Sequence, residues 1–194
     1  TQLARKMDFI LDKGHDLNWE ILSGYDAVFL QRPFTANHVK IVNMCKDNGK
    51  PIWVDYDDNL LGVPTSNRAH RIYGDPKSQN NIVEILSKAD AITVSTVGIK
   101  QVFHDIFEQI RDAVQEHEYV NVNPDKIFVI PNAYNQEFVG HYARDRYQDH
   151  QRKLIMWRGS DTHDKDLMQY TPAMKAAFAN HLDWTFNFIG NQFW

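Results

Sequence analysis

Short apolar runs alternate with amphipathic segments along this 194-residue chain, and this alternation constrains the fold more than any other feature. Strands are predicted over residues 25–31, 51–56, 91–95, 126–132, 153–160 and 184–190. Helices are predicted over residues 3–13, 36–47, 78–88, 97–110 and 164–181. Strands that alternate with helices favour a mainly parallel sheet that is covered by helices on both faces. The predicted class is therefore α/β, with a Rossmann-like parallel sheet.

Composition excludes several classes of protein. A net charge of −4 argues against a nucleic-acid binder that works through a broad basic surface. Cys45 is the single cysteine, so the chain has no internal disulfide, and its apolar neighbours indicate a small buried side chain. No apolar run approaches the ~18 residues of a membrane span. These features predict a cytoplasmic protein without a membrane span.

Two domains of unequal size are expected. Residues 1–150 hold four of the predicted strands, and residues 151–194 hold one strand, one helix and one strand. A segment of about 40 residues does not readily bury an independent core. Residues 151–194 therefore either extend the main sheet or open a second domain.

Polar or turn-forming residues follow five of the predicted strands. They are QRP (31–33), DYDD (55–58), STVG (95–98), PNAYN (131–135) and RGSDTH (158–163). Ligands of parallel α/β sheets bind at the carboxyl ends of the strands. The loop after the second strand, residues 57–76, is longer than most connections, which favours a functional segment. The sequence thus predicts one cleft along this edge.

Three carboxylates, Asp55, Asp57 and Asp58, crowd the end of the second strand. In one interpretation they line a cleft without metal, where one aspartate accepts hydrogen bonds from a substrate or acts as a base. In another they hold a divalent cation, because hard metals take carboxylate oxygens. In the third, Asp57 or Asp58 caps the loop and Asp55 pairs with an arginine.

Four more residues are candidates for contact with a substrate. Arg32 either neutralises a phosphate or pairs with the aspartates. His70 lies in the long loop, where a histidine contacts a ligand or is simply exposed. Ser95, with Thr96, either binds an anion at the start of a helix or caps that helix. Asn132 follows a proline and either fixes a turn or contacts a ligand.

Arg158, Gly159 and Ser160 form a strand end that leads into a helix. Backbone N–H groups at such a turn are able to bind a phosphate, and Arg158 adds positive charge. His163 is a further candidate for phosphate contact. The alternative is that the residues after Gly159 are ordinary helix caps.

Five segments, taken in order, resemble the glycosyltransferases built from two Rossmann-like domains (GT-B), in particular the group akin to family 4. The segments are YDAVFLQRP (25–33), GKPIWVDYDDNLLGVP (49–64), ADAITVSTVGIKQVF (89–103), KIFVIPNAYN (126–135) and LIMWRGSDTHDKDL (154–167). The resemblance implies an acceptor-binding first domain over 1–150 and the start of a donor-binding second domain over 151–194. It also implies catalysis in the cleft between them, without a metal and with a nucleotide sugar as co-substrate.

The chain departs from that family in two places. The first strand with its glycine-rich loop is expected before residue 1, and a pair of glutamates eight residues apart is expected after residue 194. The resemblance therefore implies a fragment that is inactive alone and needs a missing C-terminal portion or a partner chain.

The favoured hypothesis is transfer of a hexose from a nucleotide sugar to a hydroxyl acceptor. Asp57 and Asp58 are the candidate catalytic residues, and Arg158 with the turn at Gly159 would neutralise the departing diphosphate. The aspartates and the turn of Arg158, Gly159 and Ser160 are then expected to face each other. One alternative is a non-catalytic Rossmann-like binding or assembly module. Another is a metal-dependent sugar-phosphate enzyme that uses the aspartate cluster.

Overall fold

The computed structural model describes residues 17–113, 123–133, 137, 153–159 and 163–190. The helix predicted over 3–13 lies outside these residues. The chain divides into two compact units, one of residues 1–63 and 71–133 and the other of residues 64–70 and 134–194. Each unit is described by itself.

The first unit is built on a four-stranded sheet in which all neighbouring strands are parallel. Its strands are β1 (Val28–Gln31), β2 (Ile52–Tyr56), β3 (Ala91–Val94) and β4 (Ile127–Val129). Helices α2 (Ala36–Asp47), α4 (Pro76–Lys88) and α5 (Val97–Ala113) connect successive strands. Shorter elements are α1 (Trp19–Leu22), η2 (Leu60–Gly62), α3 (His70–Tyr73) and η3 (Pro124–Lys126). The predicted α/β class with a Rossmann-like parallel sheet is confirmed.

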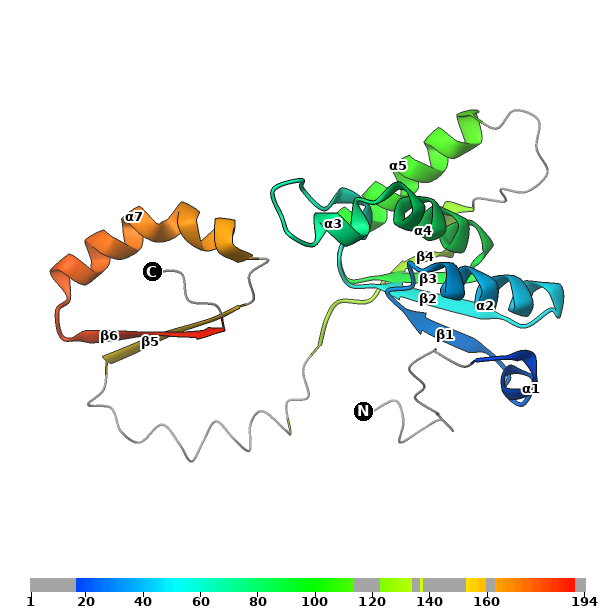
Figure 1. Cartoon of the computed structure of the whole chain (residues 1–194), viewed down its shortest axis with the longest axis horizontal. Coiled ribbons are helices and arrows are strands. Elements are labelled where there is room, and N and C mark those ends of the chain that lie inside the picture. Colours follow the sequence, from blue (N-terminus) through cyan, green and yellow to red (C-terminus); the bar gives the residue numbers. More distant parts are fainter. Residues whose placement is uncertain (1–16, 114–122, 134–136, 138–152, 160–162, 191–194) are drawn as a thin grey trace. The chain divides into compact units, whose positions relative to one another are not determined.

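The strand order β1-β2-β3-β4 follows the order of the chain. Because each connection is a crossover in the same direction and such crossovers are right-handed, α2, α4 and α5 lie on the same face of the sheet (Figure 1). The sequence predicted helices on both faces. In the described part of the chain the crossover helices occupy one face, and the segment 3–13, predicted as a further helix, is not among the described residues.

The hydrophobic core lies between the sheet and these three helices. Alternate residues of a strand point to the same face of the sheet, and residues paired between neighbouring strands share that face. The buried side chains on the face toward the helices are Val28, Leu30, Ile52, Val54, Tyr56, Ile92, Val94 and Ile127. The helices contribute Ile41, Val42, Cys45, Ile82, Ile85, Leu86, Phe103 and Phe107. Cys45 is fully buried, as its sequence context predicted. This core holds the strand ends in a fixed arrangement.

Local signals set the bounds of the crossover helices. Thr35 caps α2 in a capping box in which His38 takes the third position. Helix α2 ends at Asp47, and Gly49 follows its cap residue Asn48. The φ of Gly49 is 66°, in the left-handed region that glycine adopts without strain. Asp75 caps α4 through the N–H groups of Lys77 and Ser78, and Pro76 occupies the first turn.

The other face of the sheet carries aromatic side chains that are partly open to solvent. Phe29 packs edge-on against Trp53, with ring centroids 4.7 Å apart, and is 38% exposed. Phe128 on β4 is 52% exposed. Parallel sheets in proteins are usually covered on both faces. Within the described residues this second face is therefore the less protected side of the unit.

The second unit contains β5 (Lys153–Gly159), α7 (Asp164–Asn180) and β6 (Trp184–Gly190). Strands β5 and β6 pair in parallel as a sheet of their own and do not extend the four-stranded sheet. The strand–helix–strand elements match the predicted bounds to within a residue. The predicted boundary at 150–151 falls outside the described residues.

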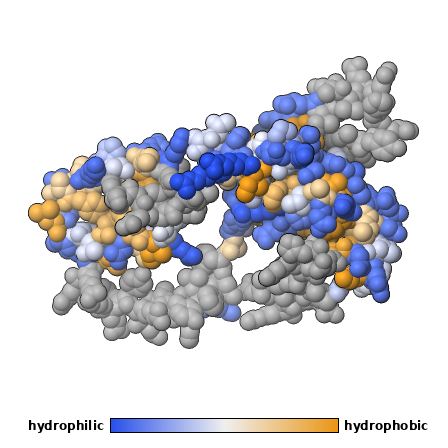
Figure 2. Space-filling view, viewed as in Figure 1, coloured by the Kyte–Doolittle hydropathy of each residue, from blue (hydrophilic) through white to orange (hydrophobic). Residues whose placement is uncertain are grey.

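Much of the apolar surface of the second unit is exposed. Figure 2 shows hydrophobic side chains over this strand–helix–strand unit. The exposed ones on the strands are Leu154, Ile155, Met156, Trp184 and Ile189, whereas Leu167 on α7 is buried. In the described part of the chain, no helix is long and apolar enough to cross a membrane.

Candidate functional site

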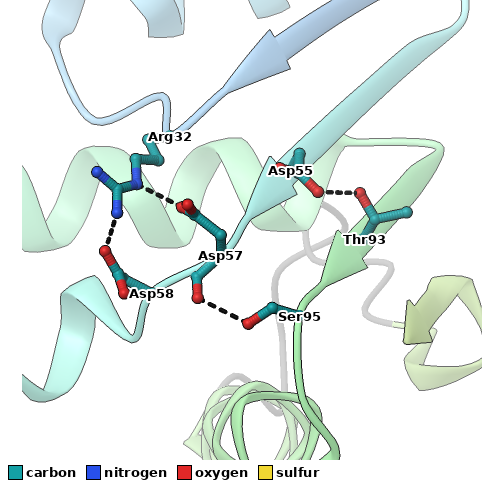
Figure 3. Close-up of polar contacts among 6 residues, drawn as sticks. All are labelled: Arg32, Asp55, Asp57, Asp58, Thr93 and Ser95. Atoms are coloured by element: carbon teal, nitrogen blue, oxygen red, sulfur yellow. Dashed lines mark hydrogen bonds and ion pairs between the residues drawn. The ribbon is translucent and has the colours of Figure 1, made fainter. Parts of the chain in front are cut away.

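The carboxyl ends of β1, β2 and β3 bring together four polar residues that the sequence singled out. They are Arg32 after β1, Asp57 and Asp58 after β2, and Ser95 after β3 (Figure 3). Parallel pairing of the strands causes this convergence, because the strands all end at the same edge. We call these four residues the carboxyl-edge cluster.

Arg32 is at the centre of the cluster. Its φ of 49° makes it the only described residue other than glycine with a positive φ. The backbone N–H of Arg32 donates to the carbonyl oxygen of Asp55, with 2.8 Å between nitrogen and oxygen. Its guanidinium donates from Nε to Asp57 and pairs through Nη2 with Asp58. Of the two predicted roles for Arg32, the structure shows pairing with the aspartates.

Electrostatics in the cluster are unbalanced, because two carboxylates face one guanidinium. The side chain of Asp57 is 30% exposed and that of Asp58 is 62% exposed. Asp58 thus presents a carboxylate to solvent while its partner Arg32 fixes its position. Such a carboxylate is an acceptor for hydroxyl or amine donors.

Ser95 joins the ends of two strands. Its Oγ donates to the backbone carbonyl of Asp57 over 2.7 Å. The neighbouring Thr96 caps α5, since its Oγ1 accepts from the N–H of Ile99 at 3.2 Å. The helix-capping role predicted for this pair therefore belongs to Thr96, and Ser95 holds the β2 end against the β3 end.

Asp55 belongs to a different set of contacts. Its Oδ1 accepts from Thr93 Oγ1 at 2.5 Å, and Thr93 Oγ1 also accepts from Trp53 Nε1 at 2.9 Å. Asp55 therefore lies on the sheet face that carries Trp53, and its side chain does not join those of Asp57 and Asp58 (Figure 3). Among the described residues, no group of three or more His, Cys, Asp or Glu side chains is placed to hold a metal ion by itself. Magnesium often takes only one or two protein carboxylates, so a cation at Asp57 and Asp58 stays a prediction.

Buried contacts hold the turn after Arg32 in place. Tyr56 Oη donates to the carbonyl oxygen of Pro33 at 2.6 Å, and the Tyr56 ring packs edge-on against Phe103. Asn81 Nδ2 donates to the carbonyl of Phe34 at 3.1 Å. Burial raises the pKa of Tyr56 above its ordinary value, so the phenol stays protonated and remains a donor.

These positioning residues were not identified from the sequence. Tyr56 sits inside an apolar strand and Asn81 inside an amphipathic helix, where both types are common. The alternation of buried and partly exposed residues along β2 places Tyr56 on the core face. A buried tyrosine usually hydrogen-bonds through its hydroxyl, so this alternation was the sequence signal that could have identified Tyr56.

Two further predicted residues, Asn132 and His70, are not members of the carboxyl-edge cluster. Asn132 is exposed, beyond the end of β4. His70 is the first residue of the short helix α3 and is grouped with the second unit. Ligand contact by either residue stays a prediction.

The predicted phosphate-binding turn is only partly described. Arg158 is exposed near the end of β5, and Gly159 pairs in register with Gly190 at the end of β6. A Cβ on Gly190 would lie 1.9 Å from the carbonyl oxygen of Gly159, so this close approach requires glycine. Ser160 lies outside the described residues.

His163 occupies the cap position of α7, and its side chain makes no capping hydrogen bond. The imidazole therefore does not perform the structural role that a cap usually has. Its predicted phosphate contact, and the predicted facing of this turn and the aspartates, stay predictions.

Comparison with known proteins gives no family assignment. No protein-family model matches the chain, and no curated protein matches it.

Proposed function

We propose that the chain takes part in glycosyl transfer, moving a hexose from a nucleotide sugar to a hydroxyl acceptor. The first unit would bind the acceptor and the second would bind the donor. The observation that carries this proposal is the carboxyl-edge cluster, where Asp58 is held by Arg32 and still presents a carboxylate to solvent. The ordered resemblance of five segments to two-domain glycosyltransferases adds support.

On the acceptor side, Asp58 and Asp57 would accept hydrogen bonds from acceptor hydroxyls. A hydrogen bond to a charged group contributes about 1.5–3 kcal/mol, which is enough to orient one hydroxyl. Arg32 already pairs with both carboxylates, so its role is to position them rather than to bind a phosphate. The cluster carries an excess of negative charge and therefore favours neutral or cationic acceptors over anionic ones.

On the donor side, Arg158 and the backbone at Gly159 would neutralise the diphosphate that leaves with the nucleotide. Arg158 is exposed at the end of a strand, a place from which a guanidinium is able to reach a ligand phosphate. A phosphate oxygen of the donor would take the acceptor proton. No metal is required in this scheme, because arginine and backbone N–H groups supply the positive charge.

Calorimetric titration with a panel of nucleotide sugars, with and without manganese, tests the donor side. We expect binding that does not depend on the metal and that weakens about tenfold or more in Arg158→Ala, the cost of one charge-assisted contact. Lys153→Ala is the matched control, because Lys153 lies on the same strand and pairs with Asp183. Equal weakening by both variants, or binding only with manganese, would contradict the donor assignment.

Amide chemical shifts recorded during titration with mono- and disaccharides test the acceptor side. Shifts are expected at Asp57, Asp58 and Ser95, and Asp58→Asn should reduce the affinity while leaving the spectrum of the core unchanged. Asp105→Asn, at an exposed carboxylate on α5, is the control. Saccharide-induced shifts that avoid the strand ends would refute this assignment.

A non-catalytic binding module is the second candidate. It is favoured by one observation: Arg32 forms ion pairs with both candidate catalytic carboxylates, a contact that positions them without requiring any chemical step. A module of this kind would bind a saccharide at the cluster and show no affinity for nucleotide sugars. The two titrations therefore separate the candidates.

A further inference from the structure

One face of the four-stranded sheet is open to solvent in the described part of the first unit. Helices α2, α4 and α5 all lie on the other face (Figure 1). We call the first surface the open face, and its side chains combine three aromatic rings with three polar groups: Phe29, Trp53, Phe128, Gln31, Asp55 and Thr93. Phe29 and Phe128 are exposed there. Parallel sheets occur almost only with both faces covered, so the open face is expected to have a partner.

The polar groups of the open face bond mainly to one another. Trp53 Nε1 donates to Thr93 Oγ1 at 2.9 Å, and Thr93 Oγ1 donates to Asp55 Oδ1 at 2.5 Å. Covering these groups therefore leaves no donor unsatisfied. Within the described residues, the other carboxylate oxygen, Asp55 Oδ2, has neither a hydrogen bond nor an ion pair. A partner for this face thus needs an apolar surface for the rings and a cation for Asp55.

The size of the open face indicates what kind of partner it fits. Four strands at ~4.8 Å spacing extend about 14 Å across the sheet, and the five residues of β2 extend about 17 Å along it. The resulting patch of roughly 240 Å² is well below the ~800 Å² that each partner of a stable complex usually buries. A helix of 11 residues is about 16 Å long and about 10 Å wide. The open face therefore suits one short helix of the same chain better than a second copy.

The sequence before the described residues supplies a segment of this length and pattern. Residues 3–13 are predicted to be helical, and at about 100° per residue their apolar stripe occupies an arc of about 100°. The stripe consists of Leu3, Met7, Ile10 and Leu11. Lys6 and Lys13 lie along one flank of this stripe, within about 60° of Ile10. The segment thus offers both an apolar surface and cations beside it, as the open face requires.

The start of the described chain places this segment within reach of the open face. Leu17 is the first described residue and packs against the core, directly before α1. Helix α1 leads into β1, which is an edge strand, and Figure 1 shows α1 beside the start of β1. The connection from residue 13 to residue 17 spans up to about 14 Å. Layers of secondary structure pack about 10 Å apart, so this connection is long enough to bring a helix onto the open face at its β1 edge.

We propose that residues 3–13 form an amphipathic helix that docks on the open face. The apolar stripe would pack on Phe29, Trp53 and Phe128, and Lys6 or Lys13 would pair with Asp55. The docking uses none of the carboxyl-edge cluster and is independent of the proposed function. Asp55 then serves the assembly of the fold rather than contact with a ligand.

Nuclear Overhauser effects in the full chain test the proposal directly. We expect contacts from the methyl groups of Met7 and Ile10 to the rings of Phe29 and Trp53. We also expect the amides of residues 3–13 to exchange at least about tenfold more slowly than those of an unstructured peptide. A sample that mixes labelled and unlabelled chains distinguishes contacts within a chain from contacts between chains. Absence of these contacts, or their appearance only between chains, would overturn the proposal.

Variants of the segment identify the side of the helix that docks. Met7→Asp places a charge in the stripe and should abolish the protection of residues 3–13, while the amide signals of the core strands stay in place. Phe9→Asp is the matched control, because Phe9 lies about 200° around the helix from Met7 and its replacement should preserve the protection. Equal losses in the two variants would overturn the assignment of the stripe.

A second pair of variants tests the ion pair with Asp55. The double change Lys6→Gln and Lys13→Gln should reduce the protection of residues 3–13 severalfold. Arg5→Gln, on the side of the helix away from the stripe, should leave the protection unchanged. An equal effect of the lysine and arginine changes would overturn the pairing with Asp55.

Discussion

Replacement of Tyr56 by phenylalanine isolates one hydrogen bond behind the carboxyl-edge cluster. The ring would keep its edge-on contact with Phe103, whose centroid lies 5.5 Å from that of Tyr56. The change would remove the donor to the Pro33 carbonyl, in a site with no solvent exposure of Tyr56. The variant therefore leaves a buried carbonyl oxygen without its partner.

The cost of this change can be estimated from the geometry. A buried acceptor left unsatisfied costs about 1–3 kcal/mol, and the short contact in a fully buried site favours the middle of that range, ~2 kcal/mol. With a urea m-value of roughly 1.5–2 kcal/mol/M for a unit of this size, the unfolding midpoint should fall by about 1 M. The urea dependence of the amide signals of Val54 and Val94 reports on this unit without interference from the second one.

The same variant should change how stability depends on pH. Burial raises the pKa of Tyr56 in the folded state, so the unfolded chain loses the phenolic proton at a lower pH. Stability contributed by Tyr56 is therefore present below the unfolded-state pKa of ~10 and is lost as the pH rises above it. Tyr56→Phe should make the alkaline limb of the stability curve shallower.

Tyr73→Phe is the matched control for this experiment. The Tyr73 ring packs against Phe34, and within the described residues its hydroxyl has no hydrogen bond. The control should lower stability by less than ~0.5 kcal/mol. Equal effects of the two variants, or an unchanged alkaline limb in Tyr56→Phe, would refute the assignment of this hydrogen bond as a fixed link to the turn after Arg32.

Three further changes test other features of the two units. Arg32→Gly and Arg32→Ala both remove the ion pairs, but glycine adopts the positive φ of 49° without strain, so the glycine variant should be about 1 kcal/mol more stable in urea unfolding. Gly190→Ala should destabilise the second unit by several kcal/mol, measured by thermal unfolding, because the new Cβ would collide with the carbonyl oxygen of Gly159. The hydrogen bond from Lys88 lowers the pKa of Glu84, so its contribution is full above the unfolded-state value of ~4.3 and is lost as the pH falls through the lower folded-state value. Glu84→Gln should therefore flatten the acid limb of a urea-stability profile.

Each of these changes has an outcome that contradicts the reasoning. Equal stability of the two Arg32 variants would mean that the left-handed backbone stores no strain. Gly24→Ala is the control for Gly190→Ala, since a Cβ at Gly24 meets only a carbonyl oxygen at 3.6 Å. If both glycine-to-alanine changes lowered stability equally, the close approach of Gly190 to Gly159 would not explain the loss. An acid limb that is unchanged in Glu84→Gln would show that the bond from Lys88 does not persist in solution.

Much of the fold was predictable because the local signals agree with the tertiary structure. The periodicity of residues 36–47 and the Asn48-Gly49 stop defined α2, and both strands of the second unit were found from their apolar runs. The start of α4 was predicted two residues late, because the pairing of Asp75 as cap with Pro76 in the first turn was overlooked. Helix α1 is only four residues long, and a segment of that length carries no readable period.

The site was predictable in its location and not in its contacts. Parallel strands necessarily end at one edge, so Arg32, Asp57 and Ser95 were expected near one another. The separation of Asp55 from the other aspartates was missed, because alternation alone would place Asp55 and Asp57 on one face, whereas β2 ends at Tyr56 and Asp57 lies beyond the strand. The left-handed backbone of Arg32 has no sequence signal, because arginine is not a residue that favours this conformation.

Strand order in the first unit has a consequence for how the chain folds. Each strand of the sheet pairs with the strand that comes next along the chain, so no pairing must wait for a distant segment. The loop that must close at each step is then only the segment between two consecutive strands, which limits the loop-closure entropy. We expect β1, α2 and β2 to form a first folding nucleus, onto which β3 and then β4 are added in the order of synthesis. In such a sequence the Arg32 pairs with Asp57 and Asp58 are available once β2 is in place, whereas the Ser95 link must wait for β3.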